Sequence, residues 1–222
     1  LKNNDALTGA AFVHFAEGMY QLEEPIRFFP KDSGFEHAPI TYLAEPGARV
    51  LFSAGKSIHN WQHIRDNRWE CDLSGSVPKG WTFQQLFVNG ERRYRARTPN
   101  EGYYRVKDPM EDPDWPFHRY RYQFKFYPGH LLSNWRNIQD IEIVLLHFWS
   151  DAHCAIENIN PNTLTVILAT PAWRRFTDDN TDQGARYYVE NVYEAMDQPG
   201  EWYYDRHKQM LYYLSHPDED MS

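Results

Sequence analysis

The chain has 222 residues, of which 41% are hydrophobic and 24% charged, so it is long enough to bury one large core or two small ones. Its 23 Lys and Arg residues stand against 31 Asp and Glu residues, and the formal net charge of −8 opposes binding to nucleic acid or to an anionic membrane. The longest apolar run, at residues 143–149, is interrupted by His147 and is too short to cross a bilayer. We therefore expect neither a nucleic-acid partner nor a membrane partner.

Residues 1–58 have the pattern of short β-strands separated by turns. Apolar runs at residues 11–16, 26–29, 40–44 and 49–53 are each followed by a turn that contains Gly or Pro. No helical periodicity fits these runs, and their spacing of roughly ten residues is typical of an all-β sandwich, barrel or solenoid. The character of the sequence changes after residue 58, so we predict that a first domain ends there.

The clearest strand is predicted over Arg119–Phe126, where aromatic side chains alternate with charged or polar ones. Residues 141–149 predict a second, more fully buried strand. The segments on either side of Asn160-Pro161-Asn162-Thr163 contain β-branched residues, and the four residues between them have the composition of a hairpin turn. These elements predict an antiparallel β-sandwich as a second domain at residues 59–168.

Residues 169–222 predict further strands after an acidic loop. One strand is expected at residues 185–192 and is followed by a helical turn at 193–196. Two more strands, at residues 201–205 and 209–214, are expected to be joined by a short polar turn. We treat this segment as a third part of the fold.

The sequence gives no strong sign of a metal or a cofactor. His59 and His63 would share one face of a helix, but no Glu follows the first of them and neither cysteine has the short spacing of zinc sites. Further histidines are His118, His130, His147 and His153. Cys71 and Cys154 would either pair in an oxidising compartment or lie buried as small hydrophobic residues. We expect no metal site and no cofactor.

Five arginines between residues 92 and 105 alternate with tyrosines, a pattern that superficially resembles a platform for single-stranded nucleic acid. Acidic neighbours nearly balance this charge, so Arg95 and Arg97 are interpreted either as structural ion pairs or as forks that hold polar ligands. The aromatic content of 16% likewise suits either a core or a face that stacks on sugars.

Carboxylates lie near aromatic residues late in the chain, and glycosidases need two carboxyl groups at a separation set by the mechanism. The carboxylates in question are Glu190, Glu194, Asp197, Glu201 and Asp205. A sequence does not give their separation, and acidic residues more often occupy solvated faces. No catalytic residue is assigned.

Three stretches resemble a known family. Residues 16–53, with Gly47-Ala48-Arg49-Val50-Leu51-Phe52-Ser53 at their end, resemble the first coils of secreted right-handed parallel β-helix proteins. The second stretch is residues 86–100, and the third begins with Tyr187-Tyr188-Val189-Glu190-Asn191-Val192 and runs to Leu214. In this order they are similar to the N-terminal part of glycoside hydrolase family 141-like enzymes, in which a β-sandwich interrupts the early β-helix.

The resemblance implies an all-β fold in which β-helix coils at residues 1–58 are interrupted by the β-sandwich at 59–168 and resume at 169–222. It also implies a secreted, extracellular or periplasmic hydrolase of polysaccharide, with fucosidase and xylanase activities known in the family. The family's catalytic acids are expected on later coils. The start at Leu1 without Met or a leader indicates a processed form or a fragment. Because members of the family continue into many more coils beyond the point that matches Ser222, the resemblance implies that the chain is the N-terminal segment of such an enzyme.

Substrate contacts are predicted for four residues that lie within the matched stretches. These are Arg95, Arg97, Asn100 and Trp202. Two alternatives remain open: a carbohydrate-binding or interaction module without chemistry of its own, and a polysaccharide lyase, which would use a base and commonly Ca²⁺. If later coils are missing, the last strands around Tyr187–Val192 would present an open edge, and we expect self-association through it.

Overall fold

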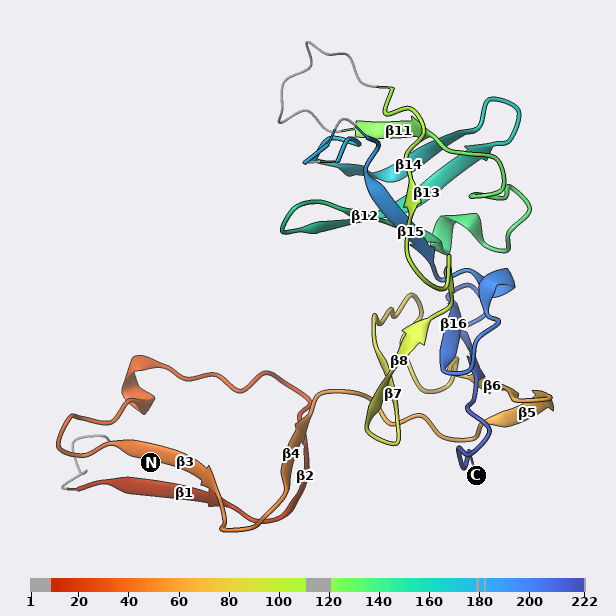
Figure 1. Cartoon of the computed structure of the whole chain (residues 1–222). Helices are drawn as coiled ribbons and strands as arrows, with labels where there is room; N and C mark the ends of the chain where they lie inside the picture. Colours follow the sequence, from red (N-terminus) through yellow and green to blue (C-terminus); the bar gives the residue numbers. More distant parts are fainter. Residues whose placement is uncertain (1–8, 111–120, 179, 182, 222) are drawn as a thin grey trace. The chain divides into compact units, whose positions relative to one another are not determined.

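The computed structural model describes residues 9–110, 121–178, 180–181 and 183–221 (Figure 1). It divides into two units, Leu1–Ile58 and His59–Ser222. Strands account for 44% of the chain and helix for 4%, which confirms the predicted all-β class. Within the described ranges, no helix has the length and apolar character that a membrane span requires.

The first unit consists of four short strands that pair in parallel. β1 (Ala11–Phe15) pairs with β3 (Ile40–Ala44), and β2 (Gly18–Gln21) pairs with β4 (Val50–Ser53). The 3-10 helix η2 (Pro30–Asp32) lies between the two halves of this arrangement in sequence. Each pair is a separate two-stranded sheet, so every strand of the unit has one edge without a partner strand among the described residues.

The second unit contains a seven-stranded antiparallel sheet folded around the larger core, and this confirms the predicted β-sandwich. The strand order is β10-β15-β12-β13-β14-β11, with β9 also paired to β15. The strands are β9 (Arg97–Thr98), β10 (Tyr104–Arg105), β11 (Arg121–Lys125), β12 (Glu142–Leu146), β13 (Asp151–Asn160), β14 (Thr165–Ala172) and β15 (Arg186–Glu190). Fully buried Ile143, Val166 and Tyr187 contribute to its core.

The strand predicted over Arg119–Phe126 is present as β11, although Arg119 and Tyr120 lie outside the described residues. Its aromatic side chains do not share one face, because Phe124 is buried whereas Tyr122 is 53% exposed. The cause is an irregularity in the pairing with β14 between Arg121 and Gln123, which interrupts the alternation of faces. The predicted hairpin is confirmed by the antiparallel pairing of β13 with β14.

A six-stranded mixed sheet forms the rest of the second unit, in the order β5-β6-β17-β16-β8-β7. Its strands are β5 (Gln62–Arg65), β6 (Arg68–Asp72), β7 (Leu86–Val88), β8 (Glu91–Arg95), β16 (Glu201–Asp205) and β17 (Met210–Leu214). Asn89 and Gly90 form the turn between β7 and β8 with φ of 54° and 79°, a backbone conformation that Asn and Gly adopt readily. A second core, around Ala96, Tyr203 and Tyr212, packs here.

The structure differs from the expectation for residues 169–222. β14 runs through the expected boundary after residue 168, and β15 to β17 belong to the two sheets of the second unit. The segment Tyr187–Val192 is not an edge, because β15 pairs with β12 on one side and with β9 and β10 on the other. The alternation of a strand reveals its faces but not its neighbours, so the sequence did not show that this strand is internal.

Both thiols are free and buried, and we predict that both are unreactive in the folded protein. Cys71 is 2% exposed and Cys154 is 1% exposed. Burial, assisted by the charge of Glu142, raises the pKa of Cys154 to about 12, and burial also raises the pKa of Cys71. A chromogenic disulfide reagent should label neither thiol at neutral pH and both after unfolding. Rapid labelling of the native chain would contradict this packing.

Candidate functional site

The site lies where the chain passes from one sheet of the second unit to the other. β8 ends at Arg95, the next residue Ala96 is fully buried, and β9 begins at Arg97. The chain crosses again after Glu190, the last residue of β15, before it enters β16. The course of the backbone therefore places Arg95, Arg97 and Glu190 at this junction.

Buried Asn191 ties the junction together. Its side-chain Nδ2 donates to the carbonyl oxygens of Asp140 at 3.0 Å and Tyr204 at 3.3 Å, and its Oδ1 accepts the Tyr204 N–H at 3.2 Å. The residue has φ of 59°, in the left-handed region that Asn tolerates better than most residues. This amide bonds backbone from both halves of the unit, so the halves are held in one fixed relation here.

Arg95 forms the centre of a charge network at this junction. Its Nη1 donates to Glu142 Oε2 at 2.8 Å, to Glu190 Oε1 at 2.6 Å and to Gln84 Oε1 at 2.9 Å. The Arg95 side chain is 9% exposed, and those of Glu142 and Glu190 are 22% and 13% exposed. The ion pairs are thus shielded from most of the solvent screening that weakens surface pairs.

His153, on β13, extends the network. Its Nδ1 lies 3.2 Å from Glu142 Oε2, and its Nε2 lies 3.7 Å from Asp151 Oδ2. The hydrogen bond to Glu142 raises the pKa of His153, against the opposing effect of partial burial. Burial alone would raise the pKa of Glu142, but the hydrogen bond from His153 and the charge of Arg95 outweigh it and lower that pKa to about 2. Glu142 is therefore ionised at any physiological pH.

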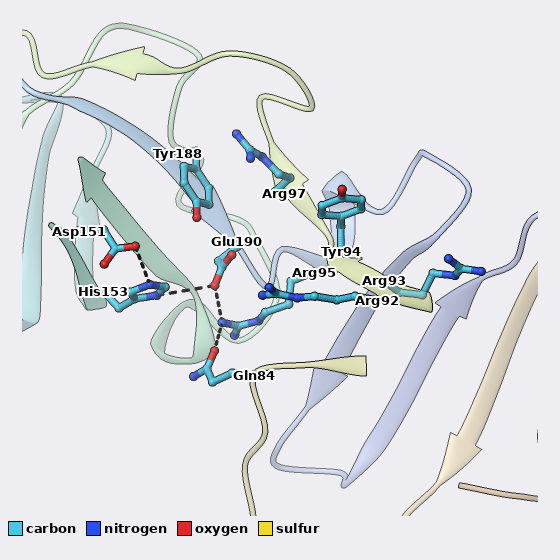
Figure 2. Close-up of a pocket in the computed structure, with 10 residues that line it drawn as sticks. All are labelled: Gln84, Arg92, Arg93, Tyr94, Arg95, Arg97, Asp151, His153, Tyr188 and Glu190. Carbon is cyan, nitrogen blue, oxygen red and sulfur yellow. Dashed lines mark hydrogen bonds and ion pairs between the residues drawn. The ribbon is translucent and has the colours of Figure 1, made fainter. Parts of the chain in front are cut away.

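An open cleft of about 630 Å³ lies above this network (Figure 2). Its walls come from β8, β9, β13, β15 and the segment before β7. The lining residues are Gln84, Arg92, Arg93, Tyr94, Arg95, Arg97, Asp151, His153, Tyr188 and Glu190. The cleft combines aromatic rings with many hydrogen-bond donors, whereas the charges at its floor are largely paired.

The hydrogen-bond donors of the cleft differ in how many interactions they already make within the protein. Arg97 stacks over Tyr188, with its guanidinium carbon 4.0 Å from the ring centroid, and donates to the carbonyls of Pro99 and Gly102. The Arg92 side chain is exposed and has no ion-pair or hydrogen-bond partner among the described residues. Tyr94 is 71% exposed. Arg92 and Tyr94 are consequently the groups most open to a ligand.

A smaller cavity of about 150 Å³ lies beside the cleft and shares Gln84 and Arg95 with it. Trp202 and Phe83 line it and stack nearly parallel to each other, with ring centroids 5.0 Å apart. Asp140 also lines it and accepts a hydrogen bond from Arg206 Nε at 2.8 Å. This cavity is more enclosed than the cleft, and its lining is more polar.

The structure brings together three of the four residues predicted from sequence to contact substrate. Arg95 and Arg97 line the cleft, and Arg95 and Trp202 line the smaller cavity. Asn100 lies outside both linings, where its Nδ2 donates to Asp197 at 2.8 Å. Arg95 forms structural ion pairs, as one of the two interpretations of the sequence predicted, and it also lines both hollows.

Sequence reasoning did not single out Glu142, His153 or Tyr188 as a group. Glu142 and Glu190 are 47 and 95 positions from Arg95 in sequence, and no local pattern connects residues so far apart. The usable signal was at the start of β12, where Glu142 precedes four apolar residues and so marks the beginning of a buried strand.

One group of potential metal ligands occurs among the described residues, formed by Glu142, His153 and Glu190, whose ligand atoms lie within 4.8 Å of one another. The guanidinium of Arg95 already bonds both carboxylates, so a divalent cation would have to displace a positive charge. The predicted helical pairing of His59 with His63 does not occur, because His63 lies on strand β5 and bonds the carbonyl of Asp66 at 2.6 Å. The geometry favours an ion-pair network over a metal centre.

A family model and a solved structure match this chain. Residues 67–216 match the family model described as the GH141 insertion domain. A solved structure titled "Glycoside hydrolase" superposes with a TM-score of 0.76 at 22% identity, over 98% of this chain and 38% of that one. The chain therefore spans well under half the length of that protein, and the likeness shows a shared fold. No curated protein matches.

We predict that Glu142→Gln lowers the pKa of His153 toward its ordinary value of 6.5, because the variant removes the charge that stabilises the imidazolium. The raised pKa of His153 contributes stability that is complete below its unfolded pKa and is lost as the pH rises through its folded pKa. The variant should weaken this part of the pH dependence. An NMR titration of the imidazole measures the change, and Glu157→Gln, at an exposed position of the same strand, is the control.

Proposed function

Since its residues 67–216 match the family model, the chain belongs to the GH141 insertion domain family, and from this we propose that its second unit binds polysaccharide for a glycoside hydrolase. The observation that carries the proposal is the cleft, where exposed Tyr94 and unpaired Arg92 stand over a fixed polar floor. Sugars present apolar C–H faces and dense hydroxyl groups, so aromatic rings beside preorganised donors suit them. Because this cleft of about 630 Å³ is open to solvent, a chain that continues beyond it can bind there.

We place catalysis outside this site because the glutamates of its charge network are unsuited to acid–base chemistry. A glycosidase needs one carboxylic acid with a raised pKa and a second carboxylate facing it across the scissile bond. The pKa of Glu142 is instead lowered to about 2, and Glu190 is bound to the same guanidinium. The pKa of Glu201 is raised by burial, but that residue lies outside the linings of both hollows and accepts three backbone N–H groups.

The first unit is proposed to be the start of a right-handed parallel β-helix. Two consecutive strands stack in parallel on two later consecutive strands, with Ala11 opposite Ile40 and Gly18 opposite Val50, as in successive coils of a solenoid. Parallel sheets are normally covered on both faces, yet Met19 is 65% exposed. Further coils would cover such side chains. Self-association is proposed to use the open edges of these strands.

The parent protein is proposed to be an extracellular or periplasmic hydrolase of polysaccharide, of the fucosidase or xylanase type that the resemblance implies. A carbohydrate-binding or interaction module without catalytic activity describes the 222 residues equally well. The two proposals differ only in the rest of the parent protein. A lyase is less favoured, because the group nearest to a calcium site, around Glu142, is occupied by Arg95.

We predict that the chain is retained by affinity electrophoresis in gels that contain its polysaccharide, and that Tyr94→Ala weakens the retention at least tenfold. The exposed ring is the largest apolar surface that the cleft offers to a sugar face. Tyr122→Ala removes a tyrosine of comparable exposure from β11, away from the cleft, and should leave retention unchanged. Equal effects of the two variants, or retention on no plant or microbial polysaccharide tested, would contradict the proposal.

We also predict that the 222-residue chain has no glycosidase activity of its own, whereas a longer parent protein does. Release of reducing sugar from xylan and of nitrophenol from an aryl fucoside measures this. Turnover by the isolated chain at the rate of the parent would contradict this prediction and would mean that a catalytic pair lies within the 222 residues.

A further inference from the structure

Tyr103 lies beside the cleft, on the outward face of the seven-stranded sheet. Strand β10 pairs with β15 so that Tyr104 lies opposite Tyr187, and both side chains pack in the larger core. Because side chains alternate along a strand, Tyr103 before the one and Tyr188 after the other belong to the outward face. Their ring centroids are 6.4 Å apart, and Tyr188 lines the cleft. Tyr103 therefore borders the cleft just outside its lining.

Arg97 holds this pair of tyrosines in place. Its guanidinium carbon lies 4.0 Å from the centroid of the Tyr188 ring (Figure 2). The same guanidinium donates from Nε to the carbonyl of Pro99 at 3.0 Å and from Nη2 to the carbonyl of Gly102 at 3.1 Å. The loop between β9 and β10 is thus fastened to the wall of the cleft at the residue before Tyr103. A ring that is oriented in advance loses little entropy when it binds a ligand.

The Tyr103 ring also has the open surface that stacking on a sugar requires. It is 51% exposed, and its ring contacts within the described part of the chain are Tyr188 and the guanidinium of Arg186, 5.7 Å from the ring centroid. Tyr94, which is 71% exposed, lines the cleft from β8 of the six-stranded sheet. The two sheets therefore each contribute one exposed ring to the same site.

The surroundings of these rings favour a sugar chain over a protein partner. Protein interfaces bury a contiguous apolar core, whereas each exposed ring here is flanked by a guanidinium, Arg186 beside Tyr103 and Arg92 two residues before Tyr94 on the same strand face. Asp151, 58% exposed at its side chain, adds a negative charge to the lining. Aromatic rings set among hydrogen-bonding groups match a ligand whose units each present a C–H face and hydroxyl groups.

From these observations we propose that Tyr103, together with Tyr188, is a second stacking platform that extends the cleft, and that a polysaccharide chain binds through at least two of its units, one at Tyr94 and one at Tyr103. This inference rests on the proposed function and specifies a chain segment, not a single sugar, as the ligand. Two linked contacts bind more tightly than either alone, because the second forms within a complex that already exists.

The first test is affinity electrophoresis in gels that contain xylan, xyloglucan, arabinogalactan or polygalacturonate. Tyr103→Ala should weaken retention at least fivefold in a gel that retains the unchanged chain, whereas Tyr103→Phe keeps the ring and should be retained within twofold of it. Tyr122→Ala removes a ring of matching exposure, 53%, from β11 and is the control. Unchanged retention of Tyr103→Ala, or an equal loss in Tyr103→Phe, would overturn the stacking role.

The second test measures the dependence on chain length, which a purely structural role of Tyr103 would not change. The polysaccharide that retains the chain is hydrolysed either partially or completely, and each hydrolysate is used as a soluble competitor. Partial hydrolysate should release the unchanged chain at a mass concentration at least tenfold lower than complete hydrolysate. This ratio should fall severalfold in Tyr103→Ala and stay the same in Tyr122→Ala. Equal competition by the two hydrolysates would overturn the proposed two-unit contact.

The outcomes separate this inference from the proposed function. Retention that depends on Tyr94 but not on Tyr103 would leave polysaccharide binding by the cleft intact and reject the second platform. Absence of retention in all four gels would reject the proposed function itself, and the second platform with it.

Discussion

The second unit depends on a single guanidinium. Arg95 leaves the six-stranded sheet at the end of β8 and bonds Glu142 and Glu190, both of which belong to the seven-stranded sheet. The three side chains are largely buried, so the ions have given up most of their hydration, and the loss of one partner from such a group typically costs 3 to 5 kcal/mol. The pairing therefore contributes more to the stability of the unit than an exposed surface ion pair does. It fixes the angle between two sheets whose hydrophobic cores are otherwise separate, and Asn191 supplements it with hydrogen bonds to backbone on both sides.

This arrangement is the reason why we propose binding, and not hydrolysis, for the cleft. An acid catalyst needs an environment that holds its proton near neutral pH, yet Arg95 and His153 hold Glu142 ionised far below that range. The same pairing that disables proton transfer makes the floor rigid, and rigid donors and acceptors lose little entropy when a sugar binds. The rigid, ionised floor of the cleft thus fits the binding role that we propose for it.

The sequence predicted the local elements of this structure but not the contacts between residues far apart in the chain. Alternation and turn composition were sufficient for β11 and for the hairpin of β13 and β14, because those signals depend on neighbours in the chain. They failed for Tyr187–Val192, which the resemblance placed at an edge and which lies between strands contributed by residues 97–105 and 142–146. The site shows the same division. Arg95 and Arg97 stood out as a local cluster, whereas Glu142 and His153 became part of it only through pairing across sheets, and Asn100 was drawn in by sequence proximity although it bonds Asp197.

Arg95 connects the stability of the unit to the shape of its two hollows. Nη1 is committed to the two glutamates and Gln84, and this commitment holds the guanidinium plane in one orientation. Because the guanidinium is planar, fixing Nη1 also fixes the direction of the Nε–H bond, which has no partner within the described protein. A lysine at this position would retain the charge but not the second, oriented donor. The residue that joins the sheets thus also lines both hollows, so the contacts that set the fold also shape the walls of the cleft.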